Sequence, residues 1–127
     1  MIDWGQVESA AAQLAKMKGS QRERVEAEFE LRAVKIVAAG APVDRLMWPL
    51  QQFEALAWQQ SATAETPYLD GLAAAQGKDP AEVRSAALAR VLTLMSESQD
   101  LAATRQRLLD AIEAAQTVDE VTSVVWQ

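Results

Sequence analysis

The sequence feature that most constrains the fold is a helix start at Asp79 and Pro80, after which no glycine or proline occurs up to the end of the chain. Asp79 supplies an acidic N-cap, Pro80 suits the first helical position, and Glu82 lies at the third. The sequence therefore predicts one long helix from Pro80 to about Gln116, roughly 55 Å in length at about 1.5 Å per residue. Residues 96–100 are polar on all sides, so they form either a break or a solvent-crossing part of the helix. We favour a single helix that can bend at residues 96–100.

The first part of the chain carries two further helix starts. Capping-box patterns begin at Asp3 and at Ser20, and each precedes a run with apolar residues at three- and four-residue steps. Gly19 lies between the two patterns, where it can end the first helix. The sequence therefore predicts an N-terminal helical hairpin over residues 1–40.

The middle of the chain predicts two shorter helices. Proline suits the first turn of a helix, so we expect one helix to start at Pro49, after a short helical turn, and another at Pro67. Leu50 and Phe53 share an apolar face of the first of these helices. Gly77 is placed to end the second.

Across the whole chain no alternating β pattern exceeds a few residues. Thr117 and Glu120 form a last capping box, which opens a C-terminal turn. We therefore expect an all-α protein with one domain over residues 1–127, a helical bundle in which the long helix pairs with the shorter ones. A long helix with a broken heptad and alanine-rich stripes is also compatible with a homodimer.

Composition excludes most catalytic chemistry. The chain has neither Cys nor His, which rules out disulfides, thiol nucleophiles, zinc fingers and histidine-dependent catalytic triads. It has no glycine-rich phosphate loop and no aspartate-rich calcium loop, and its acidic residues are expected at helix caps or on solvated faces. We therefore predict a protein that is not an enzyme, with no cofactor and no metal site.

Charge and hydropathy also restrict the partners. The net charge is −6, and the basic residues, including Arg105 and Arg107, are dispersed among acidic ones, so the basic stripe typical of nucleic-acid-binding proteins is missing. No stretch approaches the ~20 apolar residues of a membrane span. The start of the sequence lacks the basic residues and apolar run of a signal peptide. We expect neither nucleic acid nor a membrane as a partner.

The four tryptophans are the best physical hint of protein binding. Core packing is their commoner role, but aromatic side chains are also the preferred anchors of protein interfaces. Trp126 lies next to the C-terminal residue, so it stays exposed unless it docks on its own bundle or on a partner. The candidate partner-binding residues are Trp48, Gln51, Gln52, Trp58, Tyr68 and Trp126.

Three segments carry a resemblance to known proteins. Residues 48–55 read Trp-Pro-Leu-Gln-Gln-Phe-Glu-Ala, residues 64–77 include Thr-Pro-Tyr-Leu-Asp-Gly-Leu-Ala, and residues 105–112 read Arg-Gln-Arg-Leu-Leu-Asp-Ala-Ile. In this order, up to the terminal Trp126, the chain resembles a family of small bacteriophage and prophage tail proteins, described as tail proteins or tail-fibre assembly proteins. The family often has glycine where this chain has Thr104. Residues 1–40 gain little from the comparison, and residues 41–127 form the region similar to the family.

The resemblance implies a role in tail or tail-fibre assembly, and it supplies no catalytic residues. We therefore expect a non-enzymatic tail-fibre chaperone or adaptor. Its partner would be a phage tail-fibre or other tail protein, met in the host cytoplasm during assembly or within the virion. Two alternatives stay open, namely a structural subunit of the virion tail and a small phage inhibitor of a host protein.

Overall fold

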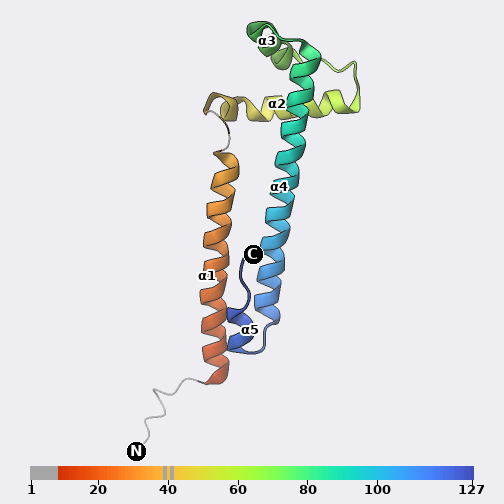
Figure 1. Cartoon of the computed structure of the whole chain (residues 1–127). Coiled ribbons are helices and arrows are strands. Elements are labelled where there is room, and N and C mark those ends of the chain that lie inside the picture. The colour runs from red at the N-terminus through yellow and green to blue at the C-terminus, as the bar shows by residue number, and fades with distance from the viewer. Residues whose placement is uncertain (1–8, 39, 41) are drawn as a thin grey trace, which may run out of the picture. The chain divides into compact units, whose positions relative to one another are not determined.

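The computed structural model describes residues 9–38, 40 and 42–127 (Figure 1). Within these ranges the chain forms five α-helices and no strand, which confirms the prediction of an all-α fold. The helices are α1 (Ala10–Val37), α2 (Pro42–Gln60), α3 (Pro67–Gln76), α4 (Pro80–Ala114) and α5 (Val118–Thr122). None of these helices is long and apolar enough to cross a membrane.

Helix α1 is a single helix, so the hairpin predicted over residues 1–40 was wrong. The helix runs through Gly19 and Ser20 without a break. Glycine inside a helix costs only about 1 kcal/mol relative to alanine. Gln21 and Val25, just beyond Gly19, are both buried, and a continuous helix keeps them on one face. Burial of that face therefore outweighs the local preference of glycine for a helix end.

The first turn of α1 is capped by Ser9. The Ser9 hydroxyl oxygen accepts a hydrogen bond from the backbone N–H of Ala12 at 3.1 Å, which satisfies one of the donors that a helix start leaves unpaired. The cap predicted at Asp3 lies outside the described residues.

Helix α2 begins earlier than predicted. It starts at Pro42, and Pro49, the expected first residue, lies inside it. A proline in a helix interior loses one backbone hydrogen bond and crowds the preceding turn, at about 3 kcal/mol. Trp48, before this proline, and Ala55, after it, both pack into the same hydrophobic core, so burial on both sides of Pro49 favours a continuous helix.

Helix α4 confirms the long helix predicted from Asp79. It is unbroken from Pro80 to Ala114 and ends just short of Gln116. The Asp79 carboxylate caps its start by accepting the N–H of Ala81 at 3.2 Å. Residues 96–100 are helical and exposed, so the polar stretch is a solvent-crossing part of one helix.

The contacts of the chain divide into two compact units. Unit 1 contains the described residues up to Val34 together with Asp100–Gln127, and unit 2 contains Lys35–Gln99. The boundary within α4 falls in the exposed polar stretch at residues 96–100. The expectation of one domain over residues 1–127 stays a prediction, and each unit is described by itself.

Unit 1 holds most of α1, the C-terminal part of α4, and α5. Its buried apolar residues are Val25, Ile112, Ala115 and Val121. Two side chains of α1 also donate to backbone carbonyls of the C-terminal region: Gln21 Nε2 to Val124 and Lys18 Nζ to Glu113, each at 2.8 Å. The C-terminal segment is thus tied to α1 by both apolar burial and hydrogen bonds.

Helix α5 begins at the capping box predicted at Thr117. The Thr117 hydroxyl oxygen accepts the N–H of Glu120 at 3.1 Å. In return, Glu120 Oε2 accepts the N–H of Gln116 at 2.7 Å, one residue earlier than in the usual box. This confirms the prediction that a capped C-terminal turn follows the long helix.

Unit 2 holds α2, α3 and the N-terminal part of α4. Its core cluster is Ala55, Leu69, Ala73, Val83, Ala87 and Val91. Alanine occupies several of these positions, and small contact residues allow short distances between helix axes. Tyr68, Leu72 and Leu88 pack against the edge of the cluster. The long helix therefore pairs with the shorter ones, as predicted.

Candidate protein-binding surface

Four large apolar side chains stand exposed along α2. They are Val43 (67% exposed), Leu46 (77%), Leu50 (40%) and Phe53 (71%). Their spacing of three, four and three residues places them on one helix face, which we call the α2 stripe. From Leu46 to Phe53 the chain holds no charged residue. Single exposed apolar side chains are ordinary, but a contiguous row is typical of an interaction site.

A buried carboxylate on α2 fixes how this helix is rotated. Glu54 is 1% exposed, and its Oε2 and Oε1 accept the backbone N–H groups of Tyr68 and Leu69, each at 3.0 Å. Both N–H groups lie in the first turn of α3, where donors lack helical partners and the helix dipole favours a negative charge. Because Glu54 must face α3, the adjacent Phe53, about 100° further round the helix, is turned outward.

A second polar cluster holds α3 against α4. Thr66 is the N-cap residue of α3, but its side chain makes no cap hydrogen bond. Its hydroxyl instead donates to Asp70 Oδ1 at 2.9 Å, and Arg84 of α4 donates to Asp70 Oδ1 at 2.7 Å and to Thr66 Oγ1 at 2.9 Å. The hydrogen bond from Arg84, followed by that from Thr66, holds the pKa of Asp70 below its ordinary value of 3.8. This cluster steadies the helix start that receives Glu54.

Five of the predicted partner-binding residues lie in unit 2, and they are more buried than the α2 stripe. Gln51 is 1% exposed. Trp48 and Tyr68 are half-buried and pack against the core cluster. Gln52 and Trp58 are also half-buried. Their role in partner binding stays a prediction, and the exposed apolar area of α2 belongs to other residues.

The sequence pattern predicts only half of the α2 stripe. It places Leu50 and Phe53 on a shared apolar face, but such a face is ordinarily the buried one. Because the helix was expected to begin at Pro49, Val43 and Leu46 fell outside it. The signal that could have found them is the regular spacing of all four residues across the proline.

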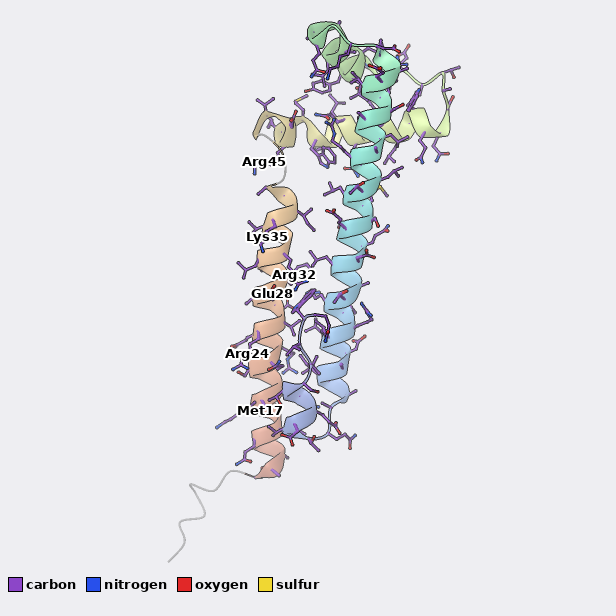
Figure 2. The ribbon with its side chains drawn as sticks, viewed as in Figure 1. Met17, Arg24, Glu28, Arg32, Lys35 and Arg45 are labelled. Atoms are coloured by element: carbon purple, nitrogen blue, oxygen red, sulfur yellow. The ribbon has the colours of Figure 1, made fainter. Side chains whose placement is uncertain are left out.

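Trp126, the sixth candidate, docks on its own unit. Its indole Nε1 donates to the backbone carbonyl of Val25 at 3.0 Å. The guanidinium of Arg32 lies over its ring, 4.7 Å from the centroid, in a cation–π arrangement. Arg32 is held in turn by Glu28, one turn earlier on α1, with Nε and Oε1 2.9 Å apart (Figure 2). The sequence left open whether Trp126 docks on its own bundle or on a partner. In unit 1 it docks on its own helix α1.

Glu26 departs from the expectation that the acidic residues cap helices or face solvent. Arg105 of α4 donates to both of its oxygens, at 2.6 and 2.9 Å, and so ties α4 to α1 within unit 1. The Arg105 guanidinium also lies 5.2 Å from the centroid of Phe29. The hydrogen bonds of this pair lower the pKa of Glu26 and raise the pKa of Arg105.

The acidic residues described above thus serve as helix caps, as inter-helix ties and, at Glu28, as a partner within one helix. Among residues 9–38, 40 and 42–127, no group of three or more His, Cys, Asp or Glu side chains could hold a metal ion. Comparison with protein-family models, curated protein sequences and solved structures found no match. The longest row of exposed apolar side chains on one helix of unit 2 is the α2 stripe.

Proposed function

We propose that this protein is a non-catalytic binding protein and that the α2 stripe contacts its partner. The observation that carries the proposal is the row of exposed apolar side chains, of which Leu46 and Phe53 are the most exposed. Burial of such surface is worth about 25 cal/mol per Å². Since no charged residue lies between Leu46 and Phe53, the stripe fits an uncharged apolar face, such as the apolar side of a partner helix.

The sequence resemblance to small bacteriophage tail proteins supports a tail protein as the partner. On this proposal the protein is a tail-fibre chaperone or adaptor that covers an apolar face of the fibre protein until the fibre assembles. A structural tail subunit or an inhibitor of a host protein would use the same stripe. These alternatives differ in what is bound and in how long the complex lasts.

Co-expression with the tail-fibre protein of the same phage tests the chaperone. We expect the yield of soluble, trimeric fibre to rise with the wild-type chain. The yield should fall to the level without it when Leu46 and Phe53 are both replaced by Glu. A matched control places Glu at Gln59 and Ala62, which are exposed and lie off the stripe, and should behave as wild type. Fibre yield that does not depend on the protein at all would contradict the chaperone.

Mass spectrometry of purified virions separates the remaining alternatives. A chaperone should be absent from the particle or present below the copy number of the tail proteins. A fixed copy number would identify a structural subunit instead. A specific complex with one host protein, formed in the absence of phage proteins and lost in the Leu46→Glu, Phe53→Glu variant, would identify an inhibitor.

A further inference from the structure

Unit 2 contains a cavity of about 520 Å³ between the last residues of α1, one side of α2, and α4. Trp48 and Leu94 form part of its apolar wall, and Gln51 and Arg90 form part of its polar wall. Gln51 and Phe53 lie two residues apart, about 200° round the helix, so the cavity and the α2 stripe occupy opposite sides of α2. A volume of this size is within the range of about 300–1,000 Å³ typical of small-ligand sites.

Gln51, which lines this cavity, carries an unpaired hydrogen-bond donor. Its side chain is 1% exposed, and its Oε1 accepts a hydrogen bond from Arg90 Nη2 at 3.3 Å. Its Nε2, which is also buried, has no hydrogen-bond partner. A buried donor without an acceptor costs about 1–3 kcal/mol. The Nε2 group of Gln51 therefore lacks one hydrogen bond, which an acceptor on a ligand would supply.

Arg90 is a second donor beside the first. Its hydrogen bond to Gln51 puts the guanidinium next to the unpaired amide. Within the described part of the chain Arg90 forms no ion pair, whereas Arg84, on the same helix, is paired with Asp70. A guanidinium beside an amide N–H group suits a carboxylate, which accepts several hydrogen bonds at once.

The two acidic residues of the cavity lie away from this pair. Asp44 is seven residues before Gln51 on α2, and Glu97 is seven residues after Arg90 on α4. Seven residues are about 10 Å along a helix, so each acidic side chain starts about two turns from the donors on its own helix. Trp48 and Leu94 lie only about one turn from them. The cavity is therefore cationic at the Gln51–Arg90 corner and apolar next to it, and further away it holds Asp44, Glu97 and a second cation, Arg45.

We propose that this cavity binds an apolar group that ends in a carboxylate. The carboxylate accepts hydrogen bonds from Gln51 Nε2 and Arg90, and the apolar body lies against Trp48 and Leu94. Such a group can come from a free carboxylic acid or from the C-terminal residue of a polypeptide. The proposal does not depend on the α2 stripe, which lies on the other side of the helix.

Calorimetric titration with matched probes tests the proposal. One pair is phenylbutyrate and phenylbutanol, and the other is acetyl-alanyl-phenylalanine with a free or an amidated C-terminus. We expect the carboxylate of at least one pair to bind more than tenfold tighter than its neutral counterpart. Preference for the first acid identifies a free acid as the natural source, and preference for the peptide acid identifies a polypeptide end. Equal affinity of acid and neutral probe in both pairs, or no binding of any probe, would overturn the proposal.

Four variants locate the binding. Ala89 lines the cavity, so Ala89→Trp should fill it and abolish binding. Ala86 is exposed on the same helix and is not among the lining residues, so Ala86→Trp should bind as wild type. Gln51→Leu keeps the volume but removes the donor, and should cut the preference for the acid at least tenfold without loss of thermal stability. The Leu46→Glu, Phe53→Glu variant should bind the acid unchanged. Binding that survives in the Ala89→Trp variant would place the ligand elsewhere and contradict the proposal.

Discussion

The carboxylate of Glu54 in α2 accepts the backbone N–H of Leu69 in α3 at 3.0 Å, and both residues are fully buried. A charged side chain is almost never fully buried unless it is paired. Here its two oxygens satisfy two donors at a helix start, where the dipole also favours negative charge. This contact sets the rotation of α2 and thereby turns the adjacent Phe53 outward.

Replacing Glu54 by Gln should therefore destabilise unit 2. The amide keeps the shape but turns one acceptor into a donor that faces the N–H of Tyr68 or Leu69, at a cost of about 1–3 kcal/mol. Urea unfolding followed by circular dichroism measures the change. Glu65→Gln is the matched control, because Glu65 is exposed, and it should leave the unfolding midpoint unchanged. Equal midpoints for the two variants would show that the cap contributes nothing.

The Asp70–Arg84 pair predicts a dependence of stability on pH. The pKa of Asp70 is lower in the folded protein than its ordinary value of 3.8, because Arg84 and Thr66 donate hydrogen bonds to it. The stability it contributes is therefore fully present above about pH 3.8 and is lost as the pH falls through the folded pKa. Asp70→Asn should be less stable than wild type at pH 7, and the difference should shrink below pH 3.8.

Urea unfolding of both proteins between pH 7 and pH 3 measures this difference. Asp100→Asn, at an exposed position on α4, provides the control and should follow the wild type throughout. An Asp70→Asn deficit that stays constant down to pH 3 would mean that the ionised carboxylate is not what stabilises the pair.

Two glycine substitutions test the helix boundaries. Gly19 lies inside α1, and a Cβ atom there would meet nothing closer than an Arg22 side-chain nitrogen at 4.0 Å, so Gly19→Ala should stabilise the protein by about 0.5–1 kcal/mol. Gly77 ends α3 with φ +66°, which alanine adopts poorly, so Gly77→Ala should destabilise it by about 1 kcal/mol or more. Thermal melting compares the two. If Gly19→Ala also destabilises, α1 contains the break that the capping pattern at Ser20 suggested.

The hydrogen bond from the Trp126 indole predicts that its removal lowers the free energy of unfolding. Trp126→Phe keeps an aromatic ring near Arg32 but loses the bond to the carbonyl of Val25, which should cost about 1 kcal/mol. Chemical unfolding of this variant should be compared with that of Trp58→Phe, which removes an indole with no described hydrogen bond. We expect the first variant to be the less stable of the two, and the reverse order would contradict the docking of Trp126 on α1.

Local signals in the sequence predicted those helix ends that local chemistry decides. Asp79 with Pro80 marks the start of α4, Thr117 caps α5, and Gly77 ends α3 in the left-handed conformation, because each of these needs only its sequence neighbours. The signals at Gly19 and Pro49 predicted helix boundaries that do not form. Side chains buried beyond Gly19 and on both sides of Pro49 favour a continuous helix, and this burial cannot be seen in a window of a few residues.

The same limit explains what could be foreseen of the candidate surface. Leu50 and Phe53 were predicted to share a face, but the outward turn of Phe53 depends on Glu54, whose partners lie in another helix. Likewise, the pairing of Trp126 with Val25 joins residues that are distant in sequence. Residue patterns predict which side chains share a face of a helix, whereas only the packing of helices decides which face is covered.

The uncharged character of the α2 stripe gives a test of its own. The chain carries a net charge of −6, but no charged residue lies between Leu46 and Phe53 of the stripe. The affinity for the partner should therefore change little between low and high salt. Titration of the tail-fibre protein in about 0.05 M and about 0.5 M NaCl would measure this. An affinity that falls more than tenfold would point to a charged surface instead.

The most direct test of the central claim is the dissociation constant for the tail-fibre protein, measured by calorimetry with three forms of the chain. We predict that Leu46→Glu with Phe53→Glu weakens binding at least a hundredfold, since two charges would have to be buried in an apolar contact. The control with Glu at Gln59 and Ala62 should bind within a few-fold of wild type. Equal affinities for all three forms would contradict the claim that the α2 stripe is the binding surface.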